Sequence, residues 1–136
     1  MDRRIILWIL SLSVLFLNSC KTPEDNIPYR KINFTVSIPS TGLVNVGGHE
    51  YFTGGVNGIV VYRFDMGTFL AYDRACPHDW DKGGRVEVVN SAYLYDSLCG
   101  SMFNILDGMP ISGPAETPLR MYQTFMPDEF TLLVFN

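Results

Sequence analysis

The protein has 136 residues and a formal net charge of −4 at neutral pH. This length suits one domain with one modest hydrophobic core. Ten lysines and arginines stand against fourteen aspartates and glutamates, and no stretch gathers basic side chains, which argues against nucleic acid as a partner.

The first nineteen residues have the features of an export signal. Arg3 and Arg4 precede IILWILSLSVLFL, an apolar stretch of 13 residues that is short for a membrane span. This stretch runs into LNSC, which places a small residue directly before Cys20, as cleavage and lipid attachment in a bacterial lipoprotein require. We therefore expect residues 1–19 to be a lipoprotein signal peptide and Cys20 to be lipidated. An uncut signal anchor is the alternative.

A lipid on Cys20 would anchor the chain to a bacterial membrane, on the periplasmic or surface face of the cell envelope. The arginine pair leaves open whether the general secretory route or the twin-arginine route exports the protein. Residues 20–29 are polar and contain two prolines. We expect them to form a tether between the membrane and a folded domain over residues 30–136.

The domain over residues 30–136 shows the pattern of an all-β fold. Between residues 32 and 38, apolar and polar side chains alternate, which predicts a half-buried strand. Three pairs of strand-like segments then flank short turns and predict three hairpins. Many short strands joined by such turns are typical of a sandwich or a small barrel. The pairs are GIVVYRF with TFLAYD around residues 65–67, RVEVV with AYLYD around residues 90–91, and LRMYQTF with EFTLLVF around residues 126–128.

Two cysteines besides Cys20 define a candidate site. In an oxidising compartment, we expect Cys76 and Cys99 to be bound to metal, paired in a disulfide or buried. Cys76-Pro77-His78 follows one predicted strand, and Asp96-Ser97-Leu98-Cys99 follows another. The two loop tips could therefore face each other. Thiolate and imidazole groups on paired loops suit a soft metal.

These motifs resemble the Rieske [2Fe–2S] family. That family carries C-x-H on one loop and C-x-x-H on a second, followed by G-S-x-F, a glycine turn, G-P-A and a proline-rich cover. Here Cys76 and His78 match the first loop, residues 100–103 match G-S-x-F, and residues 113–115 match G-P-A. The resemblance covers roughly residues 32–136. It implies a Rieske-like fold of short antiparallel sheets, with two metal-loop hairpins and a proline-rich cover loop.

The second loop departs from the family pattern, because it reads D-x-x-C in place of C-x-x-H. Carried over position by position, Cys76 and Asp96 would hold one iron of a [2Fe–2S] cluster, and His78 and Cys99 would hold the other. Exchanging a neutral histidine for an anionic ligand would lower the reduction potential below the Rieske range. Two alternatives remain: a single zinc ion on the same four residues, or no metal, with the two cysteines reduced or disulfide-bonded.

The resemblance implies a membrane-tethered electron carrier or redox subunit that passes one electron at a time to a partner in the envelope. An enzyme acting on its own is not expected, because neither of the two histidines lies in a nucleophile motif. The competing hypothesis is a cofactor-free binding module that reuses the Rieske shell.

Overall fold

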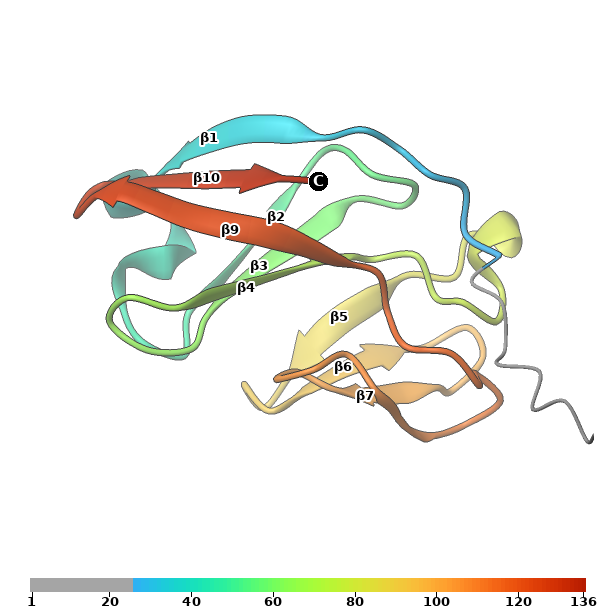
Figure 1. Ribbon diagram of the computed structural model, residues 1–136. Helices are drawn as coiled ribbons and strands as arrows, with labels where there is room; N and C mark the ends of the chain where they lie inside the picture. Colours follow the sequence, from blue (N-terminus) through green and yellow to red (C-terminus); the bar gives the residue numbers. More distant parts are fainter. Residues whose placement is uncertain (1–25) are drawn as a thin grey trace, which may run out of the picture.

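The computed structural model describes residues 26–136, which form two antiparallel sheets without an α-helix in this range (Figure 1). The all-β prediction is therefore confirmed. The predicted signal peptide, Cys20 and most of the predicted tether lie outside the described residues. Within residues 26–136, no helix is long and apolar enough to cross a membrane.

The larger sheet has six strands in the order β1-β10-β9-β4-β3-β2. Two of the predicted hairpins, β3–β4 and β9–β10, lie in this sheet, and the strand predicted near residue 32 is β1. Short 3₁₀ turns, η2 (Ile38–Ser40) and η3 (Gly42–Val44), follow β1. The strands are β1 (Asn33–Ser37), β2 (His49–Phe52), β3 (Ile59–Arg63), β4 (Phe69–Asp73), β9 (Met121–Asp128) and β10 (Thr131–Phe135).

One predicted turn falls in a different place. The sequence indicated a turn at residues 126–128, but β9 continues to Asp128 and pairs there with Thr131. The register between β9 and β10 shifts beyond this pair, which leaves Pro127 at an irregularity of the ladder. A proline has no N–H to donate, so it is tolerated in a strand at such a bulge.

The smaller sheet has four strands in the order β5-β6-β7-β8 and lies as a separate layer below the larger one (Figure 1). The third predicted hairpin is β5–β6. Three residues, 90–92, connect the strands; Asn90 and Ser91 have φ angles of +53° and +51°, as the central residues of a type I′ turn require, and the N–H of Ala92 donates to the carbonyl of Val89 at 3.2 Å. The strands are β5 (Val86–Val89), β6 (Tyr93–Asp96), β7 (Met102–Asn104) and β8 (Pro110–Ser112).

Strand β3 is buried along its whole length because both of its faces meet a core. Successive side chains of a strand point to opposite faces. Ile59 and Val61 join a first cluster with side chains of β1 and β10, so the larger sheet curls around this core. Val60 and Tyr62 join a second cluster that includes side chains of the smaller sheet. The β3–β4 hairpin thus holds the two layers together.

The buried carboxylate of Asp73 fixes the chain where β4 ends. Asp73 is fully buried, and its oxygens accept hydrogen bonds from the backbone N–H groups of Val56 (2.7 Å), Asn57 (3.3 Å) and Ala75 (2.9 Å). The hydroxyl of Tyr122 also donates to this carboxylate, at 2.8 Å. The segment that carries Cys76 therefore leaves the sheet from a well-defined point.

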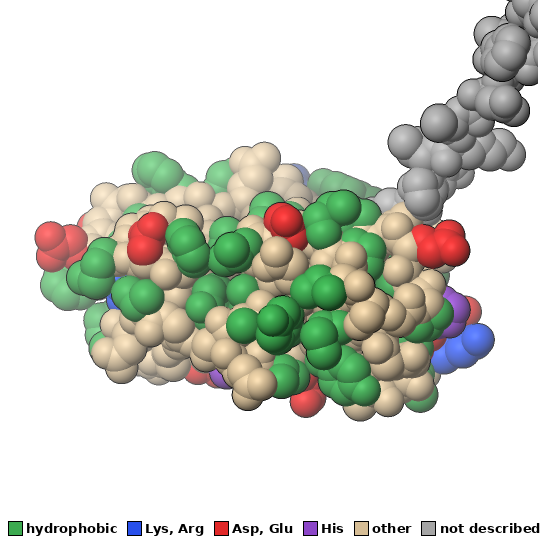
Figure 2. All heavy atoms as spheres, turned by 90° about the horizontal axis from the view of Figure 1, so that it is seen from below, with side chains coloured by type: hydrophobic (Ala, Val, Ile, Leu, Met, Phe, Trp, Pro, Cys, Tyr) green, Lys and Arg blue, Asp and Glu red, His purple; other side chains and the backbone are tan. Residues whose placement is uncertain are grey.

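Apolar side chains are exposed on the smaller sheet and its loops. Figure 2, which views the molecule from below, shows hydrophobic side chains spread over this face, with acidic groups toward its edges. The exposed large side chains of this part of the chain are Tyr93, Leu98, Leu106, Met109 and Ile111.

Candidate metal centre

Two loops lie side by side at one end of the molecule. The first connects β4 to β5, and its ends are joined by a bridge between Ala75 and Arg85. A short 3₁₀ turn, η4 (Trp80–Lys82), lies at its tip. The second loop connects β6 to β7. Because β5 and β6 are paired, with Val86 opposite Asp96, the end of the first loop and the start of the second are neighbours.

Four potential ligand atoms meet between these loops. One atom each from Cys76, Asp79, Asp96 and Cys99 lies within 4.8 Å of all the others. The two sulfur atoms are 3.5 Å apart, and both cysteines are free. Cys76 is completely buried, whereas Cys99 is partly exposed. Thiolate and carboxylate groups are the ligands of zinc and related transition metals.

Two carboxylate oxygens in this cluster lack a hydrogen-bond partner within residues 26–136. They are Oδ1 of Asp79 and Oδ2 of Asp96, on side chains that are 4% and 1% exposed. The other oxygen of Asp96 accepts a hydrogen bond from the backbone N–H of Leu98, at 2.8 Å. A buried polar group without a hydrogen-bond partner lowers the stability of the fold by roughly several kcal/mol, unless a ligand or ion satisfies it. A proton shared by the two carboxyl groups, or a bound cation, would satisfy these oxygens.

Gly84 leaves room for these carboxylates. A Cβ atom at this position would collide with Oδ1 of Asp79 and come within 2.8 Å of Oδ2 of Asp96. The backbone of Gly84 is tied into the first loop, because its carbonyl accepts from the N–H of Cys76 at 3.2 Å. Any larger residue would fill the space between the two acids.

Burial also changes the acidity of the site. Burial raises the pKa of the Cys76 thiol, although a hydrogen bond from the backbone N–H of His78 opposes this. Burial and then the neighbouring carboxyl of Asp96 raise the pKa of Asp79. Metal-free loops thus favour the protonated forms, and a bound cation would reverse this preference and release protons.

The segment after β8 covers the second loop. The hydroxyl oxygen of Ser101, which is fully buried, accepts hydrogen bonds from the Cys99 thiol (3.1 Å) and from the backbone N–H of Ala115 (3.0 Å). Gly113 has a φ angle of +91°, and a Cβ there would lie 2.5 Å from the Cα of Ser101. The G-P-A segment can therefore pack closely on the loop only because it begins with glycine.

Of the residues singled out from the sequence, the structure brings Cys76, Asp96 and Cys99 together. His78 is exposed and is not part of the group of converging ligand atoms. Asp79 takes the fourth place, and the sequence analysis did not consider it. A signal for it was present, because Cys76 to Asp79 and Asp96 to Cys99 have the same spacing of three residues.

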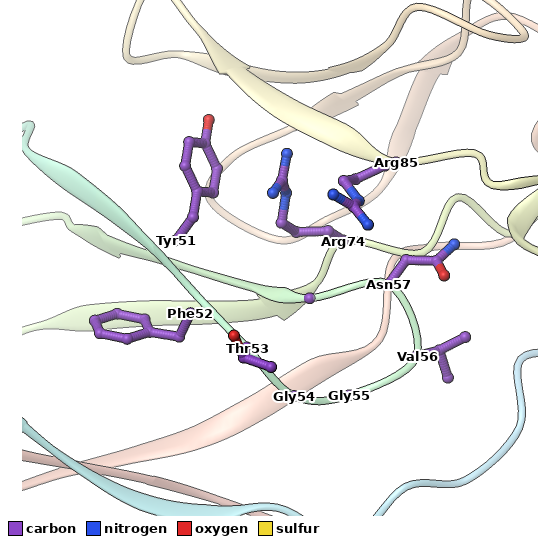
Figure 3. A pocket seen from close by; sticks show the side chains of 10 residues that line it. Tyr51, Phe52, Thr53, Gly54, Gly55, Val56, Asn57, Arg74 and Arg85 are labelled. Carbon is purple, nitrogen blue, oxygen red and sulfur yellow. The ribbon is translucent and has the colours of Figure 1, made fainter.

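A separate hollow of about 500 Å³ lies beside the first loop (Figure 3). Arg74 and Arg85 point into it from one side, and residues 53–58 form the other. The guanidinium of Arg74 stacks 4.1 Å above the Tyr51 ring, and its Nε donates to the carbonyl of Val86 at 2.9 Å. None of the four converging ligands lines this hollow.

Asn57 connects this hollow to the metal loop. Its side-chain amide donates to the carbonyls of Trp80 and Gly84, both at 2.9 Å. These bonds hold the tip of the first loop against residues 53–58, so the position of Asp79 is supported from outside the cluster.

Comparison with known proteins shows the fold of this chain. Among solved structures, it is similar to a chain in the complex of reduced oxygenase and oxidized ferredoxin of carbazole 1,9a-dioxygenase, with 21% identity and a TM-score of 0.55 over 76% of this chain and 93% of that one. It is also similar to the ferredoxin of carbazole 1,9a-dioxygenase from Nocardioides aromaticivorans IC177, with 19% identity and a TM-score of 0.51 over 78% and 97% of the chains.

A third similar structure is a putative NADH-dependent nitrite reductase small subunit from Mycobacterium tuberculosis, with 14% identity, a TM-score of 0.51 and coverage of 78% and 96%. No family model and no curated protein matches the chain. Together, these structures show that the chain has a Rieske-like fold.

Proposed function

We propose that this chain is a lipid-anchored metalloprotein of the bacterial cell envelope that passes one electron at a time to a protein partner. The fold is shared with ferredoxins, one of which stands in a complex with its oxygenase. The redox centre would lie between the two loops that hold Cys76, Asp96 and Cys99. The resemblance of the motifs to the Rieske family suggests iron at this position.

The observation that carries the proposal is the convergence of two thiols with two buried carboxylates, of which two oxygens are unpaired. A protein without a cation would not be expected to bury such a group of acids in one place, because each unpaired oxygen destabilises the fold. When bound, iron supplies one-electron chemistry. The anionic ligands would favour its oxidised state and lower its potential relative to a centre with two histidines.

The remaining residues of the site would control access to the centre. Buried Cys76 and the covering segment at Ala115 exclude water from one side. Leu98, which directly precedes Cys99, is 59% exposed. A partner that docks on this apolar tip would come close to the partly exposed sulfur of Cys99.

The anchor is the second part of the proposal. Lipid on Cys20 would hold the domain near the membrane through a short tether. The last residues of the predicted tether are bound to the domain. The guanidinium of Arg120 donates to the carbonyls of Ile27 (2.5 Å) and Pro28 (2.6 Å). The described fold therefore begins at Ile27, only seven residues after Cys20 in the sequence, and so short a tether would keep the domain near the membrane surface.

Metal analysis of the full chain, purified without air from its host membranes, tests this proposal. We expect iron in the protein, visible absorption and an electron paramagnetic resonance signal after one-electron reduction or oxidation. Cys76→Ser and Cys99→Ser should remove all three, whereas Ser97→Ala, an exposed change in the same loop, should not. Iron-free protein without a redox-active signal would refute electron transfer.

The lipid is tested separately, by labelling cells with a radioactive or clickable fatty acid. Wild-type protein should be labelled and found with membranes, and Cys20→Ala should be unlabelled. Label that persists in the variant would contradict attachment at Cys20.

A second candidate function is a metal-free binding module. The two sulfurs are 3.5 Å apart, so a small movement would allow a disulfide, and a disulfide would leave no thiolates for a metal. Mass spectrometry of protein alkylated without reduction distinguishes this case. A metal-free chain lighter by two hydrogens, with neither cysteine alkylated, would support the module.

A further inference from the structure

The two loops offer their ligands with the same spacing. The first presents Cys76 and Asp79, the second presents Asp96 and Cys99, and each pair is three residues apart. Each pair spans a turn: the N–H of Asp79 bonds to the carbonyl of Cys76 (3.2 Å), and the N–H of Gly100 bonds to that of Asp96 (2.9 Å). Structural zinc sites use ligand pairs at similar spacing, C-x₂₋₄-C, on two such turns.

We propose that these four residues bind one metal ion, tetrahedrally, and that His78 is not a ligand. This inference rests on the proposed function, which places a metal centre between the two loops. It replaces the expected two-iron cluster with one ion and replaces His78 with Asp79 as a ligand. The chemical class of the ion is a divalent transition metal of intermediate softness, either iron or zinc.

Distances support a single ion. Zn–S bonds of about 2.3 Å and Zn–O bonds of about 2.0–2.2 Å place tetrahedral ligands roughly 3.3–3.8 Å apart. The two sulfurs are 3.5 Å apart, and no pair of the four ligand atoms exceeds 4.8 Å. A two-iron cluster spreads its ligands over two metal atoms and their bridging sulfides, so ligands of different irons lie farther apart. Small side-chain movements would bring the ligand pairs that approach 4.8 Å to the spacing that one ion requires.

The unpaired oxygens point to the same ligand set. Oδ1 of Asp79 and Oδ2 of Asp96 belong to side chains more than nine-tenths buried, and both face the space that Gly84 leaves open. His78 adjoins Cys76 but has an exposed side chain.

Charge is consistent with this assignment. Two thiolates and two carboxylates carry four negative charges, so a divalent ion leaves a net charge of −2. A structural zinc site with four cysteines has the same charge. All four positions of a tetrahedral ion are then taken by protein atoms, which makes the site closed rather than catalytic. A single iron would retain the one-electron chemistry of the proposed function, and zinc would not.

Metal titration of the full chain tests the inference. Metal-free protein, reduced and prepared with a chelator, is titrated with Co²⁺ and then Zn²⁺, and the visible bands of tetrahedral cobalt are followed. We expect one equivalent to saturate the site. Asp79→Asn should weaken binding by about 100-fold or more, and His78→Ala, the matched control one residue away, should stay within about threefold of wild type. Circular dichroism of the metal-free variants checks that they fold.

The outcomes separate this inference from the proposed function. One iron per chain with a redox signal supports both, and one zinc without it supports the inference alone. Two irons per chain, or binding that is lost in His78→Ala and retained in Asp79→Asn, would overturn the inference and leave electron transfer standing. Protein that takes up no iron, cobalt or zinc would overturn both.

Discussion

The buried carboxylate of Asp73 and the buried pair Asp79 and Asp96 differ in the number of hydrogen bonds that they accept. Asp73, at the end of β4, accepts three backbone N–H groups and a tyrosine hydroxyl. Asp79 and Asp96, between the two loops, each keep one buried oxygen without a partner in the described chain. All three side chains are less than 5% exposed. The difference therefore lies in how their charge is compensated and not in how deeply they lie.

This contrast separates an acid whose charge the fold compensates from two acids whose charge it leaves uncompensated. At Asp73, the protein itself supplies the positive ends of four dipoles, so nothing further is needed and the chain around it is fixed. At Asp79 and Asp96, the fold gathers acids and thiols and leaves their compensation to something else. A cation is the simplest group that satisfies two carboxylates and two thiolates together.

The largest effect is expected from Asp73→Asn. The amide replaces an acceptor with a donor opposite several N–H groups, so stability should fall by about 3 kcal/mol or more, with or without metal. Urea unfolding of metal-free protein measures this, and Asp81→Asn, at an exposed site, is the control. A loss that appears only when metal is present would contradict the structural role of Asp73.

Metal should stabilise the folded wild-type chain by binding at Asp79 and Asp96. At about 100 times the dissociation constant, an ion that binds only folded protein adds about 2.7 kcal/mol. In the double variant Asp79→Asn, Asp96→Asn, this gain should disappear. Without metal, the double variant should be as stable as wild type or more so, because two poorly compensated buried acids are gone. Thermal unfolding with chelator and with Zn²⁺ compares the four cases, and a metal-free double variant that is much less stable would contradict the comparison.

High pH should reduce the stability that the hydrogen bond between Tyr122 and Asp73 gives to the fold. Burial first, and then Asp73, raise the pKa of Tyr122. The folded protein therefore holds this proton at a pH where the unfolded chain releases it. The stability that Tyr122 contributes is complete below about pH 10 and is lost as the pH rises toward the folded value. In Tyr122→Phe, the decline of stability above pH 10 should be shallower by about 1.4 kcal/mol per pH unit. Equal slopes for the two proteins in urea unfolding would refute this linkage.

The smallest effect is expected where a carboxylate faces water. Glu87 lies 3.3 Å from Arg74, but its side chain is 70% exposed. Glu87→Gln should change stability by less than about 0.5 kcal/mol, because water already compensates this charge. Urea unfolding at low and high salt checks this. A change above about 1 kcal/mol would contradict the idea that water compensates the charge of an exposed carboxylate in this molecule.

Much of the fold could be predicted because its signals are local. Alternation around Val36 and the turns at residues 65–67 and 90–91 identified strands and hairpins that the structure contains. The turn near Pro127 was misplaced, because a bulge let β9 continue past the proline. The pairing of β4 with β9, and the burial of β3 on both faces, depend on segments far apart in the chain. Local patterns contain no information about such contacts.

The sequence by itself determined the fold class, the two loops and three of the converging residues: Cys76, Asp96 and Cys99. Only the tertiary structure decided that the side chain of Asp79, and not that of His78, lies beside these three. The motif favoured His78, but its side chain is exposed, whereas Asp79, the residue before η4, is buried with a ligand atom within 4.8 Å of that of Asp96. The physical reason is that Gly84 and Asn57 hold the loop from outside the motif, so contacts distant in sequence set the direction of each side chain.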